Sequence, residues 1–172
     1  MLCEDLSFHI SHRFLHWGPI YPYIHKLHHN YITTVGIASE YAHPIEYIIG
    51  NIFPSSLGAM ILGKNMHYCT LLLWSVFRTF ETLDGHCGYE FSWSPFRLLP
   101  FSSSASYHDF HHSHNVGNYS SLFSLWDTVM GTNTAYYKHI ENISKQQKKV
   151  AISHHELSEK LISAEQVNSK ED

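Results

Sequence analysis

Charged side chains are scarce in this sequence. Asp, Glu, Lys and Arg make up 15% of its 172 residues, whereas about a quarter is usual in soluble domains. Aromatic residues also reach 15%. A low charged content together with a high aromatic content favours a largely buried or lipid-contacting chain. The formal net charge of −4 provides no basic field to attract nucleic acid, so nucleic acid is excluded from the expected partners.

Cysteine is also rare. Cys3, Cys69 and Cys87 are odd in number, widely spaced and without a C-x-x-C pair, which argues against a disulfide framework and a thiolate zinc site. The first residues show no basic segment followed by an apolar run, so we expect internal segments to carry any membrane insertion. No glycine-rich phosphate loop or dinucleotide fingerprint occurs, so any reaction that needs reducing equivalents would have to draw them from another protein.

Histidine, by contrast, is abundant, with 16 residues. Three clusters have helix-compatible spacing: H-x-x-x-H at His12 and His16, and H-x-x-H-H at His25, His28 and His29 and again at His108, His111 and His112. Residues three and four apart share a helix face, so each cluster is expected to point toward one place. Eight converging imidazoles exceed the needs of one ion and predict a site for two.

The spacing does not choose the metal, because imidazole suits Zn, Cu, Fe and Ni. The remaining isolated histidines are interpreted as solvated or hydrogen-bonded residues rather than ligands. These are His9, His67, His114, His139, His154 and His155.

Two apolar stretches suggest the architecture. Residues 6–29 are expected to be helical with a break at Gly18-Pro19, and apolar runs follow at about 45–63 and 66–80. On hydropathy alone, core helices of a soluble protein and a membrane hairpin are equally compatible with these runs. A hairpin over about 45–80 would keep all three histidine clusters on one side, and lysines after residue 138 favour the cytosolic side. The predicted fold is therefore an all-α integral membrane helical bundle with a cytosolic di-metal site over residues 1–136, followed by a polar tail, 137–172, that is solvated or disordered.

The histidine motifs in order, with Glu40-Tyr41-Ala42-His43-Pro44, Asp84-Gly85-His86-Cys87-Gly88 and Trp126-Asp127-Thr128-Val129-Met130-Gly131, resemble the fatty acid hydroxylase and sterol desaturase superfamily. The H-K-L-H-H, E-Y-A-H-P and H-D-F-H-H contexts are most similar to its C-4 methylsterol monooxygenase branch. The likeness runs from about Asp5 to Tyr136.

This resemblance implies a membrane oxygenase of the endoplasmic reticulum with two iron ions, for which zinc could substitute on purification. It would use O2 and electrons passed from NAD(P)H through a reductase and cytochrome b5. Its substrates would be 4-methylsterols, oxidised at the C-4 methyl group during sterol biosynthesis.

The resemblance also assigns residues. The eight clustered histidines carry over as iron ligands, and His86 stands where the superfamily supplies a further one. His43 is a weaker candidate that could instead support a ligand residue or act as a capping residue. Asp109 and Glu40 are candidates to accept the second N–H of ligand imidazoles, and Arg13 could pair with one of them.

Members of the family usually carry two more spans before the first histidine motif, whereas this sequence begins a few residues ahead of it. Without those spans a chain would lack part of the substrate cavity and of its lipid anchorage, so activity is an open expectation. The alternatives are a sterol C-5 desaturase or fatty acid hydroxylase, a truncated non-catalytic metal-binding membrane protein, and a soluble zinc-binding domain whose core holds residues 45–80.

Overall fold

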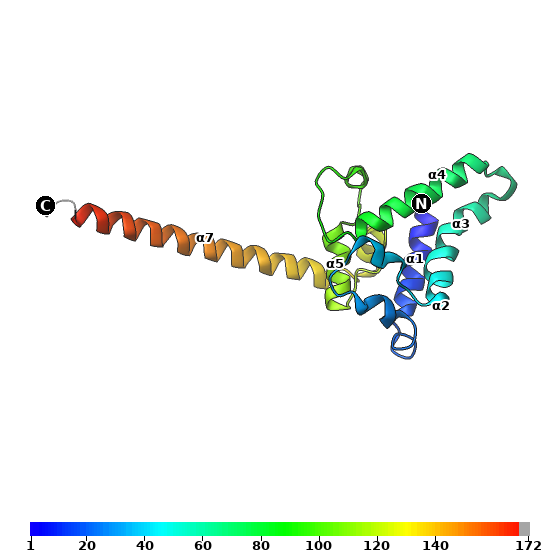
Figure 1. Cartoon of the computed structure of the whole chain (residues 1–172), viewed down its shortest axis with the longest axis horizontal. Coiled ribbons are helices and arrows are strands. Elements are labelled where there is room, and N and C mark those ends of the chain that lie inside the picture. The colour runs from blue at the N-terminus through cyan, green and yellow to red at the C-terminus, as the bar shows by residue number, and fades with distance from the viewer. Residues whose placement is uncertain (169–172) are drawn as a thin grey trace. The chain divides into compact units, whose positions relative to one another are not determined.

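The computed structural model describes the backbone of residues 1–168 and the surroundings of side chains 1–160. Over this range it is helical, with one isolated bridge between Ser102 and Phe123, so the all-α prediction is confirmed for the described residues. The elements are α1 (Leu2–Leu15), η1 (His25–Asn30), η2 (Gly36–Glu40), α2 (Pro44–Glu46), η3 (Tyr47–Ile52), α3 (Phe53–Leu62), η4 (Gly63–Asn65), α4 (Tyr68–Gly85), η5 (Pro95–Leu98), α5 (Ala105–His114), α6 (Leu125–Met130) and α7 (Thr134–Asn168) (Figure 1).

The chain divides into two compact units, Met1–Tyr136 and Tyr137–Asp172. The first unit holds every element from α1 to α6. The second is the helix α7, whose described side chains from Lys138 onward are mostly exposed. Such a helix has no buried apolar face of its own, in keeping with its Lys, Glu and Gln content.

The predicted break at Gly18-Pro19 is present, whereas the segment after it differs from the helix predicted up to residue 29. Helix α1 ends at Leu15, turns follow across Gly18-Pro19, and the first H-x-x-H-H lies on the 3₁₀-helix η1. The prolines Pro19 and Pro22 explain the difference, because proline cannot supply the amide donor that a continuing α-helix needs. Helix α1 packs along α3 and η3, and its His12 ring contacts Tyr119 O and His25 Nε2.

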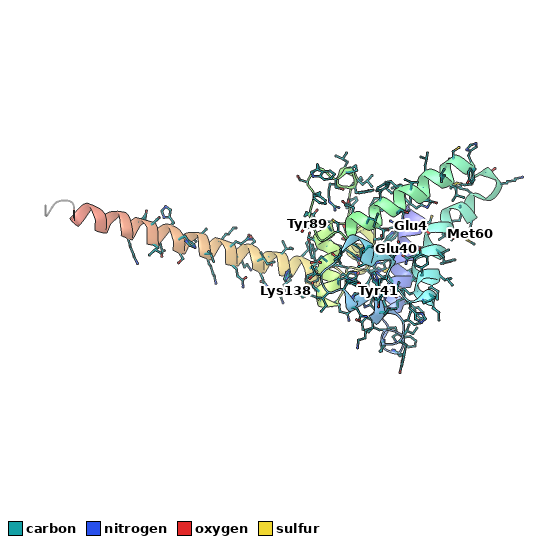
Figure 2. The ribbon with its side chains drawn as sticks, viewed as in Figure 1. Glu4, Glu40, Tyr41, Met60, Tyr89 and Lys138 are labelled. Atoms are coloured by element: carbon teal, nitrogen blue, oxygen red, sulfur yellow. The ribbon has the colours of Figure 1, made fainter. Side chains whose placement is uncertain are left out.

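The first apolar run forms one continuous helical stretch, Pro44–Asn65, with mean hydropathy 1.4 and 17% of its most apolar window buried. Within it, η3 is a π-helix shortly before Pro54. The wider turn of a π-helix accommodates the amide donor that proline lacks. Because so little of this apolar helix is covered by protein, it does not behave as the core helix that a soluble zinc-binding domain would require. Figure 2 shows Met60, near its end, on the outside of the unit.

The second apolar run lies on α4, and the hairpin over about 45–80 stays a prediction. Among the described residues, Pro44–Asn65 alone is long and apolar enough to be a candidate span. Helix α4 continues through Arg78, Glu81 and Asp84, and these charges make its C-terminal half too polar. Arg78 and Glu81 are buried and paired with each other, and Arg78 Nε also lies 3.0 Å from Glu4 Oε1 of α1. The charges therefore serve helix-helix packing beside the site.

Candidate metal centre

Nine buried or half-buried histidines gather at the centre of the first unit, and they are the nine that the sequence singles out. They form two groups, within each of which one nitrogen from every ring lies within 4.8 Å of the others. The first group is His12, His16, His25, His29 and His111, and the second is His28, His86, His108 and His112. Rings of the two groups adjoin, as His29 and His112 stack with centroids 4.6 Å apart.

Each H-x-x-H-H motif divides its histidines between the two groups, which corrects the expectation that each motif points to one place. On η1, His25 and His29 join the first group while His28 joins the second. On α5 the outer histidines, His108 and His112, join the second group and His111 crosses to the first. The doubled final histidine thus turns two neighbouring rings to different sides, because successive residues on a helix point about 100° apart. Each of the two motifs therefore contributes histidines to both groups.

Backbone carbonyls fix the orientation of five of these rings. A carbonyl can only accept, so the ring nitrogen facing it must be the protonated donor. The Nδ1–H groups donate as follows: His12 to Tyr119 O at 2.8 Å, His28 to Tyr41 O at 3.2 Å, His86 to Thr82 O at 2.9 Å, His111 to Gly117 O at 2.6 Å and His112 to Tyr31 O at 3.1 Å. In the neutral ring this leaves Nε2 as the lone-pair nitrogen, which is the form that binds metals.

The lone-pair nitrogens then face one another. His28 and His86, whose Nδ1 atoms both carry the proton, approach Nε2 to Nε2 at 3.4 Å, and His86 lies 2.9 Å from His108 in the same way. Two acceptors repel at such distances unless a cation lies between them. Nitrogens bound to one metal at about 2.0–2.1 Å are themselves about 2.9–3.4 Å apart. In the first group the Nε2 atoms of His12 and His25 are 3.1 Å apart, so the spacing in both groups fits a metal ion.

Gly117 allows the backbone turn that lies next to His111. Its φ is +61°, and a Cβ there would collide with the Thr132 carbonyl oxygen, so only glycine suits this turn. The turn aims the Gly117 carbonyl at His111 Nδ1. Helix α5, which carries His111, begins at Ser104, whose side chain accepts from Tyr107 N, a favourable N-cap.

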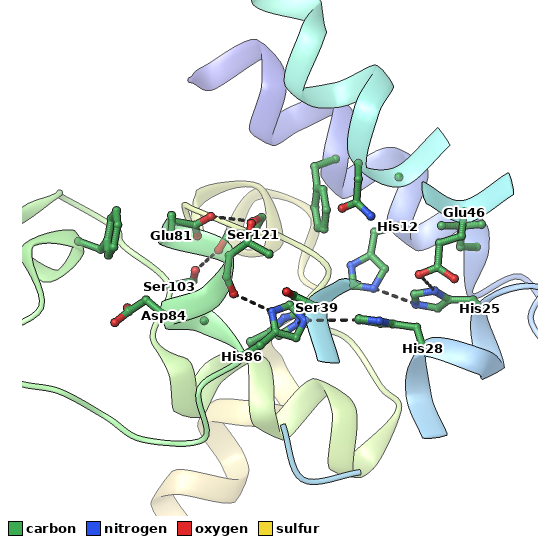
Figure 3. Close-up of a pocket in the computed structure, with 18 of the residues that line it drawn as sticks. His12, His25, His28, Ser39, Glu46, Glu81, Asp84, His86, Ser103 and Ser121 are labelled. Carbon is green, nitrogen blue, oxygen red and sulfur yellow. Dashed lines mark hydrogen bonds and ion pairs between the residues drawn. The ribbon is translucent and has the colours of Figure 1, made fainter. Parts of the chain in front are cut away.

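A carboxylate missed by the sequence analysis supports the first group. Glu46 Oε1 lies 2.8 Å from His25 Nδ1, and both side chains are buried (Figure 3). Burying a carboxylate costs free energy unless it has a partner. The position of Glu46 inside an apolar run therefore could have indicated that it pairs with another residue. It takes the role expected of Asp109 and Glu40.

The two carboxylates assigned that role bind elsewhere. Asp109 accepts from the amide and hydroxyl of Thr34, and Glu40 accepts from the Tyr47 hydroxyl. Arg13 does not pair with either of them and instead lies 3.9 Å from Met130 Sδ. Spacing along the chain could not reveal these partners, because each pair is set by tertiary packing.

Two histidines outside the groups have structural roles. His43 Nδ1 accepts from Ile45 N at the start of α2, so of its predicted roles it has the capping one. His9 is fully buried, yet its Nδ1 faces Ser120 Oγ at 3.2 Å and Asp127 Oδ1 at 3.4 Å. It therefore helps to hold α1 against the segment before α6.

Burial determines the charge of the site. Desolvation lowers the pKa of His28 to about 4 and those of His12, His29 and His86 to about 3, and neighbouring imidazoles lower them further for His12, His29 and His86. The pKa values of His16, His25, His108, His111 and His112 are lowered for the same two reasons. All nine rings are consequently neutral near pH 7 and ready to act as ligands without first losing a proton.

A narrow cavity reaches both groups. Its volume is about 50 Å³, and its walls include His12 and His25 of the first group and His28, His86 and His108 of the second. Figure 3 shows Glu81, Ser103 and Ser121 lining it away from the histidines. We call this space the metal cavity.

The sequence matches the fatty acid hydroxylase family over residues 1–132. The chain belongs to that family.

Among curated relatives, methylsterol monooxygenase erg25B of Aspergillus fumigatus is 46% identical over 132 residues, covering 75% of this chain and 44% of the relative. Methylsterol monooxygenase 1 of Rattus norvegicus is 41% identical over 147 residues, covering 85% and 49%, and that of Danio rerio is 42% identical over 140 residues, covering 79% and 46%. The chain spans about half the length of these relatives. No solved structure matches it.

Proposed function

We propose that this chain is a di-iron monooxygenase that oxidises the C-4 methyl group of 4-methylsterols with O2 during sterol biosynthesis. The observation that carries the proposal is the pair of buried all-imidazole groups joined through both H-x-x-H-H motifs. The relatives named methylsterol monooxygenases support the choice of sterol and of a monooxygenase reaction, and iron is the metal that the resemblance to the superfamily implies.

The nine histidines would hold the metals, five around one ion and four around the other. A pair of irons bound there would supply oxygen activation and the removal of hydrogen from an unactivated methyl group. The protein's own part is to keep every imidazole neutral, to fix rings through their Nδ1–H groups, and to leave a space too small for bulk water beside the site.

The surroundings support a membrane location. Pro44–Asn65 is apolar and mostly uncovered, and lipid would satisfy its surface. We propose that the protein resides in the endoplasmic reticulum membrane with the metal centre facing the cytosol. We also propose that cytochrome b5 and its reductase supply the electrons, as the resemblance to the superfamily implies.

Sterol analysis tests this function. The chain is expressed in cells that lack their own C-4 methylsterol oxidase, and the accumulated 4,4-dimethylsterol is followed by mass spectrometry. Conversion of the C-4 methyl to alcohol or acid is the expected result. A new C-5 double bond or a hydroxylated acyl chain would instead identify another activity of the superfamily, and iron binding without any product would identify a non-catalytic metal-binding protein.

A further inference from the structure

The metal cavity is too small for a whole sterol. Its volume is about 50 Å³, whereas pockets that enclose small organic ligands measure about 300–1,000 Å³. If the proposed function holds, only the reacting end of the substrate fits beside the histidines. The bulk of the molecule must lie in an adjoining space.

Two apolar grooves on the first unit are large enough. One, of about 670 Å³, lies between α4 and the segment that leads to α5. The other, of about 530 Å³, is lined by residues of α1 together with Ile49, Phe53 and Leu57. We call them the outer groove and the span groove, because the latter's walls include the candidate span.

The outer groove alone of these two shares walls with the metal cavity. Asp84 and Phe96 line both spaces, whereas the lining of the span groove has no residue in common with the metal cavity. Asp84 lies near the end of α4, just ahead of His86, a member of the second histidine group. The shared wall is therefore also the approach to that group.

The polarity of the outer groove matches a molecule with one polar end. Its walls are mainly aromatic and aliphatic, and its polar residues, Asp84, Ser94 and Cys87, are few. Ser94 Oγ and Arg97 Nη2 both donate to Asp84 Oδ2, at 3.2 and 3.0 Å, so the polar edge lies where the groove meets the metal cavity. In a 4-methylsterol the C-3 hydroxyl adjoins the C-4 methyl, and the rest of the molecule is hydrocarbon.

We propose that the outer groove holds the hydrocarbon body of the sterol, with the hydroxyl at the Asp84–Arg97 edge and the C-4 methyl directed into the metal cavity. The proposal rests on the sterol function above and adds the location and orientation of the substrate. It predicts that groove-lining residues set the choice among sterols without touching the metals.

The three cysteines provide a direct test. Cys87 lines the outer groove, Cys3 lines the span groove, and Cys69 is exposed and lines neither. The iron-loaded full chain in phosphatidylcholine nanodiscs is treated with a maleimide, with or without 4,4-dimethylsterol, and the modification of each cysteine is followed by mass spectrometry. At about ten times its Kd, a ligand leaves about a tenth of its site free, so Cys87 should react about tenfold more slowly while Cys3 and Cys69 keep their rates.

Two leucine variants supply a matched comparison. Leu99→Trp fills the outer groove and should remove most of the protection of Cys87, whereas Leu57→Trp fills the span groove and should leave it unchanged. Equal effects of both variants would overturn the proposal, as would protection of Cys87 in sterol-free nanodiscs as strong as with sterol, which would assign the groove to bilayer acyl chains.

Turnover measured in the same samples separates this proposal from the function. Oxidation of the sterol without protection of Cys87 would overturn the groove assignment and leave the function intact. Protection of Cys87 by sterol without any oxidised product would support the groove assignment and contradict the proposed activity. Iron content measured before and after the maleimide reaction shows that modification has not displaced metal.

Discussion

At the scale of the residue, the two H-x-x-H-H motifs act as connectors between metal positions. His28 is the one histidine of its motif in the second group, where its Nε2 lies 3.4 Å from that of His86. The group has four members, so losing one leaves three imidazoles and an incomplete shell.

His28→Ala should therefore lower bound metal from two ions toward one per chain and abolish oxygenation, while the protein stays membrane-bound. His154→Ala, at an exposed position of α7, should change neither quantity. Metal analysis of the two purified variants, combined with product analysis, provides the check. Equal loss in both would contradict the assignment of the ligands.

Glu46 acts on the metal through another residue. Its carboxylate holds His25 Nδ1 at 2.8 Å, and removing such a partner typically weakens metal affinity about 10–100-fold. Glu46→Gln keeps the shape but places an amide, a weaker acceptor than a carboxylate, beside His25 Nδ1, so iron should leave the first group at lower chelator concentrations. Glu40→Gln is the matched control, because Glu40 contacts the Tyr47 hydroxyl and no histidine. Identical chelator titrations for the two variants and the wild type would show that Glu46 has no such role.

The residues of the site were predictable to different degrees. All nine grouped histidines could be selected from spacing and family resemblance, because ligand spacing is a local property of the sequence. Their division between two groups could not, since it depends on how η1, α4 and α5 face one another. The carbonyls of Tyr119 and Gly117 were also unpredictable, because every residue has a carbonyl and only the fold chooses which one meets a ring.

At the scale of the element, α1 is anchored to the rest of the unit by buried acids. Asp5 Oδ1 accepts from the amides of Leu122 and Phe123, at 2.9 and 3.2 Å, and ties α1 to the segment before α6. Burial nevertheless raises the pKa of Asp5 to about 7, because desolvation outweighs these two hydrogen bonds.

This shift makes the contribution of Asp5 to stability depend on pH. In the unfolded chain the carboxyl loses its proton near its ordinary pKa of 3.8, so between that pH and about 7 the folded state binds more protons and stability falls as pH rises. Asp5→Asn keeps the acceptor oxygen without the charge. It should raise the stability of the chain at pH 8, by at most about 4 kcal/mol, and this gain should shrink toward pH 4.

Thermal unfolding in detergent at several pH values measures this effect. A stabilisation that stays constant across the range would show that charge at Asp5 is not its cause. The helices themselves were predictable only in part. The clustered histidines of α5 and the break at Gly18-Pro19 after α1 could be predicted from the sequence. The 3₁₀ form of η1 could not, because the positions of the prolines do not specify the local geometry that follows them.

At the scale of the whole molecule, the first unit combines one apolar helical stretch, two neutral imidazole groups and an apolar groove that shares walls with the metal cavity. The second limb of the predicted hairpin lies on α4, where Arg78 pairs with Glu81 and with Glu4 of α1. Sequence hydropathy counts such charges without knowing their partners, so it could not distinguish a lipid-facing helix from one that supports the metal site.

The proposed chemistry requires iron in both histidine groups. Metal analysis and Mössbauer spectroscopy of the full chain, purified from ⁵⁷Fe-grown cells without chelators, measure this occupancy. We expect two irons per chain in nitrogen-rich coordination, falling toward one in His28→Ala. One iron or none in the wild-type chain, with no other metal in its place, would contradict a two-metal centre.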